Sequence, residues 1–163
     1  MAYISTISSA SAHFEVFRQG SSALIVENLG YDPVAGKAYS LMLALEPLPG
    51  SPDILVEAEM AFCIVEEDDL LDESRQIWSG LDTARLIPKA ERKRILLHVL
   101  AAIEAMVRNV PAEVIHYFTM DEDPPQKALR KFVDIARRFE TCGYEVRTYD
   151  PYHGRCVWKA VKR

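Results

Sequence analysis

Hydrophobic and polar residues alternate in the first half of the chain in a way that predicts β-strands. Along residues 54–65, Met60 and its alternate neighbours are mostly apolar, while Glu59 lies on the other side; this is the two-residue period of a strand with one core face. Two earlier runs, residues 23–28 and 38–45, are β-prone and are joined by the turn-forming stretch GYDPVAGK. We therefore expect an antiparallel hairpin followed by a third strand.

The second half of the chain has the period of helices. From Lys89 onward, apolar residues recur at every third or fourth position, which places them on one helical face. These residues are Leu96, Val99, Leu100, Ile103, Met106 and Val107. His98 lies on the less apolar side of this helix and is expected to face solvent or a partner. A second helix is expected to begin after an N-cap at Asp123, with prolines in its first turn, and to stop at Gly143.

The remaining apolar runs complete a single α+β domain. Residues 114–120 form a compact run that suits a central strand covered on both faces, and residues 145–149 and 156–161 flank a turn-rich DPYHG stretch that predicts a final hairpin. The expected order is β-β-β-α-β-α-β-β, a largely antiparallel mixed sheet with two main helices. Residues 1–21 are weakly patterned and are expected to form an irregular arm or a short helix around residues 13–17.

An acidic segment, residues 66–84, separates the third strand from the first main helix, and we expect it to be an insertion containing a loop or a short helix. It carries apolar residues among its carboxylates. Such a segment suits recognition of a basic protein partner with an aromatic anchor. The competing interpretation is a solvated surface screened by the basic residues that follow. The candidate partner-binding residues are Asp68, Asp69, Leu70, Leu71 and Trp78.

Composition narrows the classes of function. The formal net charge of −5 and the pI near 5.4 argue against a general binder of nucleic-acid backbone. A basic stripe, residues 85–94 together with second-helix positions such as Lys131, leaves weak nucleic-acid binding as a third hypothesis. The three cysteines lack CxxC spacing and no HExxH motif occurs, so no disulfide framework or metal site is expected. No signal peptide or membrane span is predicted, and a cytoplasmic, non-membrane protein is expected.

The order of elements and two short strings resemble the Gcn5-related N-acetyltransferase family. Residues 140–146, ETCGYEV, are similar to the family's EKLGFxV ending, and residues 87–96, IPKAERKRIL, stand in the place of V-x-P-x-x-R-G-x-G-x-G. In that family the backbone N–H groups of this motif hold the coenzyme A pyrophosphate at a helix N-terminus, and its glycines allow close approach. The resemblance covers roughly the last two thirds of the chain and implies an acetyltransferase-like sheet.

The chain departs from this family at the residues that carry its chemistry. Arg92, Arg94 and Leu96 stand where the glycines would be, and Glu91 stands where the arginine would be. Phe139 falls at the position of the tyrosine that often protonates the departing coenzyme A thiolate, and a phenyl ring cannot donate that proton. The resemblance therefore implies a scaffold retained without a cofactor and without acetyl transfer.

The leading hypothesis is a non-catalytic protein-binding or regulatory module on an acetyltransferase-like scaffold, with an unknown and basic partner; a homodimer through an exposed sheet edge is a further expectation. The alternative is an acyl-coenzyme A-dependent N-acyltransferase that holds acetyl-coenzyme A with Arg92 and Arg94 and uses His116 or Asp121 as a base. His116 also fits a hydrogen-bonded strand residue, and Asp121 fits the acidic start of a helix. Middle strands that open in a V would favour the enzyme, and a sheet covered by residues 66–84 would favour binding.

Overall fold

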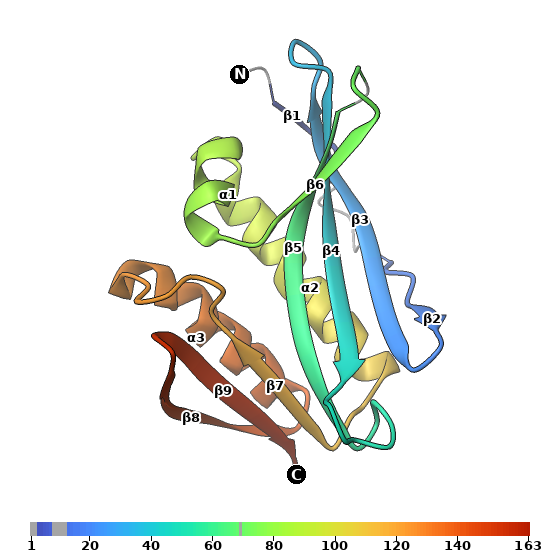
Figure 1. The fold of residues 1–163 in the computed structure, drawn as a ribbon, viewed down its shortest axis with the longest axis vertical. Helices are drawn as coiled ribbons and strands as arrows, with labels where there is room; N and C mark the ends of the chain where they lie inside the picture. The colour runs from blue at the N-terminus through green and yellow to red at the C-terminus, as the bar shows by residue number, and fades with distance from the viewer. Residues whose placement is uncertain (1–2, 8–12, 69) are drawn as a thin grey trace.

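The computed structural model of the chain describes residues 3–7, 13–68 and 70–163. Over these residues the fold is α+β, with one mostly antiparallel sheet and three helices (Figure 1). None of these helices is long and apolar enough to cross a membrane. The strands are β1 (Ile4–Ser5), β2 (Phe17–Gln19), β3 (Ser22–Asp32), β4 (Lys37–Pro47), β5 (Glu57–Asp68), β6 (Glu73–Ile77), β7 (Val114–Phe118), β8 (Tyr144–Tyr152) and β9 (Arg155–Lys162). The helices are α1 (Gly80–Leu86), α2 (Arg92–Asn109) and α3 (Gln126–Thr141).

The order of strands in the sheet is β1-β3-β4-β5-β7-β9-β8, with β2 paired to β3 and β6 paired to β5. The pair of β5 and β7 is parallel, and it extends only from residues 57–59 to residues 114–116. Beyond that point the two strands diverge (Figure 1), and β6 pairs with β5 from Ile64 onward. Since β4 occupies the other edge of β5 along its whole length, β6 and β7 share one edge. Residues 60–63 lie between the two pairings and form the mouth of an opening.

The β3–β4 hairpin is specified by its own turn chemistry. The Asp32 carboxylate accepts hydrogen bonds from the N–H groups of Val34 and Ala35 at 3.0 and 3.1 Å, which closes the turn that the Asp-Pro step predicts. Gly30 has a φ of 157° at a bulge in β3. A Cβ at this position would collide with the carbonyl oxygen of Ile4, so the glycine allows β1 to approach and pair.

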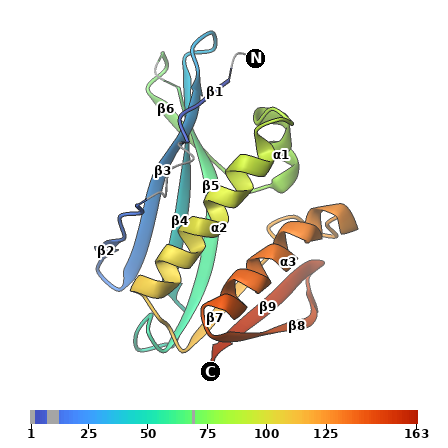
Figure 2. The ribbon, with the colours of Figure 1, turned by 180° about the vertical axis from the view of Figure 1, so that it is seen from behind.

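Helices α2 and α3 lie on the same face of the sheet (Figure 2). The apolar stripe predicted for α2 is confirmed, because Val99, Ile103 and Met106 are buried between the helix and the sheet. The stripe of α3 is buried in the same way through Phe132 and Ile135. The core therefore occupies one side of the sheet, and neither of these helices covers the opposite side.

A stack of aromatic rings fastens α3 to the last three strands of the sheet. The rings of Phe132 and Trp158 are 4.6 Å apart, those of Trp158 and Tyr117 are 5.5 Å apart, and those of Tyr117 and Phe139 are 5.2 Å apart. Tyr144 adds an edge-on contact to Phe139, and its hydroxyl donates to a backbone carbonyl at 2.7 Å. Aromatic pairs at these separations stabilise the fold beyond the burial of their apolar area. The strands β7, β8 and β9 and the helix α3 therefore form one firmly packed unit.

Of the loop or short helix expected within residues 66–84, a helix forms only at the end, in α1; the stretch before it forms the end of β5, a turn and the strand β6. The turn is closed by the Asp68 carboxylate, which accepts the N–H groups of Leu70 and Leu71. A strand is favoured here because β5 offers a free edge whose backbone groups β6 can satisfy. The helix begins later, at α1, where the Ser79 hydroxyl is the N-cap and accepts two backbone N–H groups.

The predicted N-cap at Asp123 is also wrong. Helix α3 begins at Gln126 with Pro125 at its N-cap position, and Asp123 lies in the preceding turn with a φ of 45°. Two consecutive prolines explain the delay, because a residue that precedes a proline is held out of the helical region and Pro124 precedes Pro125.

The described part of the N-terminal arm contains the short strands β1 and β2. No helix forms at residues 13–16, and the short strand β2 follows them. Phe14 instead packs on α2, where its ring lies 4.9 Å from that of His98. The prediction that His98 faces solvent or a partner is therefore wrong: the arm buries it, and burial lowers the pKa of its imidazole.

We predict that Ile103→Ala destabilises the protein by about 2–5 kcal/mol, because the deletion leaves a cavity between α2 and the sheet. Ile103 is fully buried. Leu97, on the exposed side of the same helix, provides the control: Leu97→Ala should change stability by about 0.5 kcal/mol or less. Urea unfolding followed by circular dichroism measures both, and equal effects would contradict the burial of this face.

Candidate functional site

The sheet face opposite α2 and α3 is unusually apolar for a face without a helix over it. The register of β3, β4 and β5 aligns its side chains in rows that cross all three strands. In antiparallel sheets such a face usually carries polar residues, and a contiguous apolar patch marks an interaction surface. We call this surface the open face; its accessible apolar residues include Leu24, Val26, Met42, Ala44 and Ala61.

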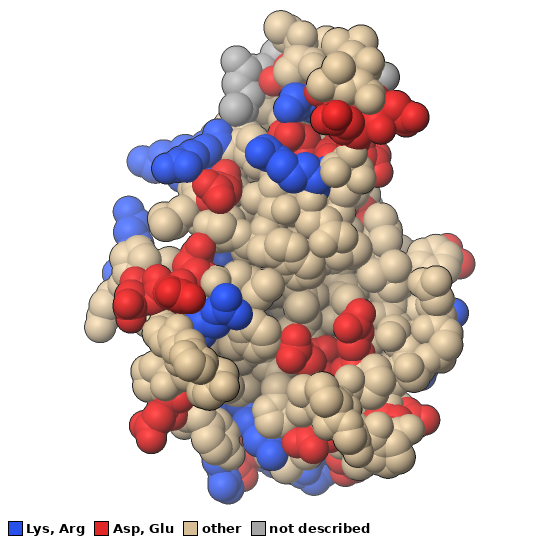
Figure 3. Space-filling model, viewed as in Figure 1, with Lys and Arg blue, Asp and Glu red and all other residues tan. Residues whose placement is uncertain are grey.

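A groove of about 510 Å³ crosses the open face. Its floor includes Met42, Ala44 and Ala61, while Trp78 and Met120 also line it. Figure 3 shows acidic side chains gathered at the hollow in the middle of this face. The groove therefore has an apolar floor and carries negatively charged side chains.

The carboxylates of the groove are Glu46 and Glu59, which are direct cross-strand partners on β4 and β5. Burial raises the pKa of Glu59, and the neighbouring negative charge of Glu46 raises it further. Two adjacent carboxylates attract a cation, because a positive charge relieves both their repulsion and the cost of burying Glu59.

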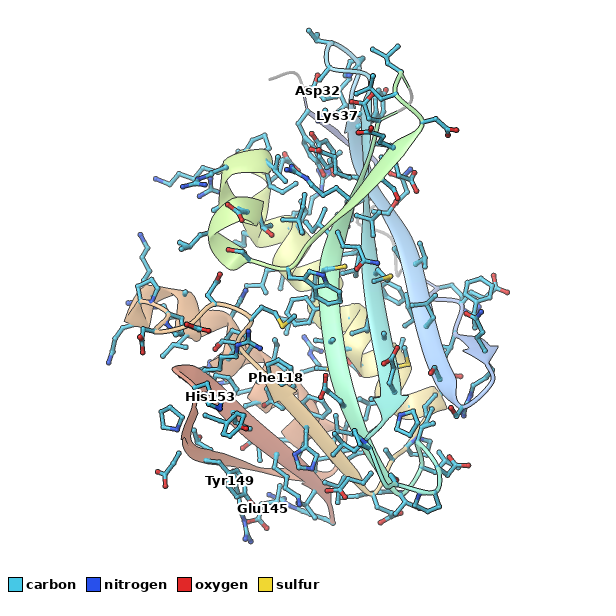
Figure 4. All side chains as sticks on the ribbon, in the orientation of Figure 1. Asp32, Lys37, Phe118, Glu145, Tyr149 and His153 are labelled. Carbon is cyan, nitrogen blue, oxygen red and sulfur yellow. The ribbon has the colours of Figure 1, made fainter. Side chains whose placement is uncertain are left out.

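His116 continues this row of polar residues onto β7, where it lies beside Glu59 in the parallel register. Its Nε2 is 2.7 Å from Oε1 of Glu57, a distance at which the ring N–H donates to the carboxylate. Lys159 Nζ lies 3.5 Å from the same oxygen. The hydrogen bond from His116 holds the pKa of Glu57 below its ordinary value. Figure 4 shows that Phe118 follows further along β7, toward the opening.

The other predicted candidate base, Asp121, is held by a different part of the fold. It follows β7, and its Oδ2 accepts the backbone N–H of Gly80 at 3.1 Å. This bond ties the loop after β7 to the first residue of α1. His116 and Asp121 thus belong to separate surroundings, one on the open face and one at the opening between β5 and β7.

A second hollow lies at this opening, on the side of the helices. It is a cavity of about 220 Å³ between β5, β6, α1 and the first turns of α2. Trp78 lines both this cavity and the groove of the open face. Apolar side chains make up most of the wall, among them Leu41, Ile64, Ile77, Ile87, Ile95 and Val99.

Lys131 is the most unusual charged residue at this cavity. Its ammonium nitrogen lies 5.8 Å from the ring centre of Phe62 and 5.1 Å from that of Phe132. Burial lowers the pKa of the amine, and the negative charge of Asp121 acts in the opposite direction. The sequence assigned Lys131 only to the basic stripe, because nothing in the helical pattern distinguishes it from the exposed Lys127 one turn earlier.

The two arginines considered for a cofactor are both engaged within the fold. Arg92 Nε donates to the carbonyl of Ile87 at 3.0 Å, and another of its N–H groups donates to the carbonyl of Ala84. The Arg94 guanidinium donates to the carbonyl of Ile7 at 3.2 Å and also pairs with a carboxylate on its own helix. Arg92 therefore caps the end of α1, and Arg94 fastens the N-terminal arm.

The predicted partner-binding residues do not form one cluster. Leu70 and Leu71 are exposed at the tip of the β5–β6 hairpin, where the Asp68 carboxylate closes the turn. Asp69 lies outside the described residues. Trp78 is half-buried at the opening and lines the groove. Figure 4 places Lys37, at the start of β4, at the end of the sheet where that hairpin tip lies.

Comparison of the chain with protein-family models, with curated proteins and with solved structures finds no match. Among the described residues, no group of three or more histidine, cysteine or acidic side chains is arranged to hold a metal ion.

We predict that His116→Ala raises the pKa of Glu57 toward its ordinary value, because the variant removes a donor that stabilises the carboxylate. Conversely, Glu46→Gln should lower the pKa of Glu59, because it removes a neighbouring negative charge, and should leave Glu57 unchanged. Carbon-detected NMR titration of the glutamate carboxyl groups measures both residues. An unchanged Glu57 in His116→Ala would show that the contact does not form in solution.

Proposed function

We propose that this chain is a protein-binding module on an N-acetyltransferase-like scaffold, and that the open face of the sheet is its binding surface. The observation that carries the proposal is the apolar groove of about 510 Å³ on a sheet face that α2 and α3 leave uncovered. A partner that covers this groove would remove apolar surface from water, which is the main driving force of protein association.

The chemistry of the groove selects the partner. The charged residues that line it are Glu46 and Glu59, both acidic. A lysine or arginine from the partner would pair with these carboxylates while its apolar neighbours cover Met42 and Ala61. Complementary charge of this kind sets the specificity of an interface and the rate at which it forms. The proposed occupant is therefore a basic, partly apolar segment of another protein.

The scaffold part of the proposal is supported by the arrangement around the opening. A parallel pair, β5 and β7, separates after a short contact; α2 connects the two strands, and α3 with the β8–β9 hairpin follows. This is the order of elements on which the resemblance to acetyltransferases depends. The segment that bears Trp78 enters the opening, and α1 packs against the start of α2.

The start of α2 does not fit a coenzyme A pyrophosphate. Residues 87–96 contain no glycine. The Arg92 side chain folds back onto the carbonyls of Ile87 and Ala84. The helix begins with Glu91 as its N-cap, a negative charge where a phosphate would need positive potential. These residues support a binding module over a cofactor-dependent enzyme.

Among the residues first proposed as the partner site, Trp78 reaches the groove. We propose it as the aromatic anchor, because large aromatic side chains at the edge of a groove often dominate binding energy. Leu70 and Leu71 are proposed as an accessory contact for a partner long enough to reach the hairpin tip.

We predict that a short peptide of alternating lysine and leucine binds the open face, because it offers both cations and apolar side chains. Nitrogen–proton NMR spectra of the labelled protein should shift at β3, β4, β5 and Trp78. The double variant Glu46→Gln/Glu59→Gln should lower the affinity for the peptide by about tenfold or more.

Two comparisons make this test specific. A peptide of alternating glutamate and leucine should cause no such shifts, and Glu113→Gln/Glu140→Gln, which removes two exposed carboxylates outside the groove, should bind like the wild type. Shifts spread over the helices would contradict the proposal. A homodimer detected by sedimentation would also contradict it if Val26→Asp abolished that dimer. The open face would then bind a second copy of the chain.

One observation favours a second candidate, the acyl-coenzyme A-dependent transferase: the strands β5 and β7 diverge beside a cavity. We predict that calorimetric titration with acetyl-coenzyme A shows no binding to the folded protein at millimolar concentration, because the start of α2 lacks a phosphate cradle. Saturable binding that Arg92→Ala/Arg94→Ala abolishes would overturn this prediction and favour the enzyme.

Nucleic-acid binding receives less support from the structure. Arg138 lies 2.7 Å from the carboxylate of Glu104, and Arg137 lies 3.4 Å from that of Asp134. Lys131 lines the cavity. Since these members of the basic stripe are neutralised or turned inward, we do not propose a nucleic-acid partner.

A further inference from the structure

We propose that the cavity of about 220 Å³ is a binding site for a small amphiphilic anion, a short aliphatic or aromatic carboxylate, with the ammonium group of Lys131 as its counter-ion. The site is separate from the open face, and the inference does not rest on the proposed function.

The size and lining of the cavity define the apolar part of the ligand. An apolar protein cavity of about 150 Å³ can hold benzene and stays free of water when empty. The present cavity is larger, and residues such as Leu41, Ile95 and Val99 provide an aliphatic wall. A chain or ring of about six carbons with a polar head fits this space, and burying it supplies roughly 0.8 kcal/mol per CH₂ group.

The charges at the cavity define the head group. The ionisable residues on its wall that carry charge at neutral pH are Arg92 and Lys131, both cationic. The Arg92 guanidinium already donates to two backbone carbonyls. Asp121 does not line this cavity; it lines a smaller neighbouring hollow that Lys131 also lines, and its Oδ2 accepts the N–H of Gly80. Lys131 is therefore the cation available to an incoming anion.

The surroundings of Lys131 leave its ammonium poorly solvated. Two aromatic rings, Phe62 and Phe132, face it at cation–π distances, and its burial is strong enough to lower the pKa of the amine. A buried ammonium group without full hydrogen bonding is costly. A bound carboxylate would accept its N–H groups in charge-assisted hydrogen bonds, which are about twice as strong as neutral ones.

Gly80 determines where the ammonium group can lie. A Cβ on this residue would come within 2.9 Å of Lys131 Nζ, so an alanine would displace the end of the lysine chain. Because Gly80 has no left-handed φ, alanine is compatible with its backbone. Gly80→Ala is thus a means of moving the cation while keeping its charge and the fold.

The test compares hexanoate, hexanamide and hexylamine, which each contain six carbons and differ in the head group. Calorimetric titration should show hexanoate binding, hexanamide binding about tenfold or more weakly, and no binding of hexylamine. NMR shifts caused by hexanoate should be confined to the lining of the cavity, which comprises α1, the first turns of α2, the adjoining parts of β5 and β6, and the region of Lys131.

Variants assign the effect to the ammonium group. Lys131→Met should reduce hexanoate affinity to the level of hexanamide, Lys131→Arg should retain most of it, and Gly80→Ala should weaken it. Lys127→Met, which removes an exposed charge one turn away on α3, is the matched control and should bind like the wild type.

The comparison of ligands on the wild-type protein keeps the proposal falsifiable even if a variant fails to fold. Equal affinity for hexanoate and hexanamide, or no hexanoate binding in the millimolar range, would overturn it. Shifts on the open face instead of the cavity would also overturn it, and Glu46→Gln/Glu59→Gln should leave hexanoate binding unchanged, which separates this result from that of the proposed function.

Discussion

The structure depends on how one edge of β5 is divided. Near its start this edge pairs with β7 in parallel over residues 57–59, and near its end it pairs with β6 from Ile64 onward. A strand edge must satisfy its backbone N–H and C=O groups, and the two partners pair with opposite ends of this edge, which leaves residues 60–63 paired with neither β6 nor β7. The interval between them is the opening, and the chain between β6 and α1 places Trp78 there.

The two hollows follow from that opening, and they differ in charge. On the open face the groove contains Glu46 and Glu59, whereas the cavity on the helix side presents Lys131 and Arg92. Trp78 lines both, so one aromatic ring separates an acidic surface from a basic interior. A cationic partner and an anionic ligand would therefore be drawn to opposite sides of the same sheet.

Much of the architecture could be predicted from local patterns. The three-four spacing of Val99, Ile103 and Met106 specifies a helix with one buried face, and it is buried as expected. The alternation of residues 54–65 correctly placed Glu59 opposite the core, although the strand itself is shifted to Glu57–Asp68. The strand β6 was missed because its residues are largely exposed; its partner, the free edge of β5, is a tertiary feature. Pro124 and Pro125 were interpreted as part of the first turn of a helix. They instead delay the start of that helix to Gln126.

The sequence by itself determined the periodicities, and hence the main strands and the two long helices, because these depend on neighbours within a few positions. Only the tertiary structure decided which charges meet: Glu46 and Glu59 are brought together by strand register, and Lys131 is half-buried by the packing of α3 against the opening. A lysine has the same local signal whether it faces water or a cavity, since its burial depends on residues such as Phe62 and Gly80 that are far away in the chain.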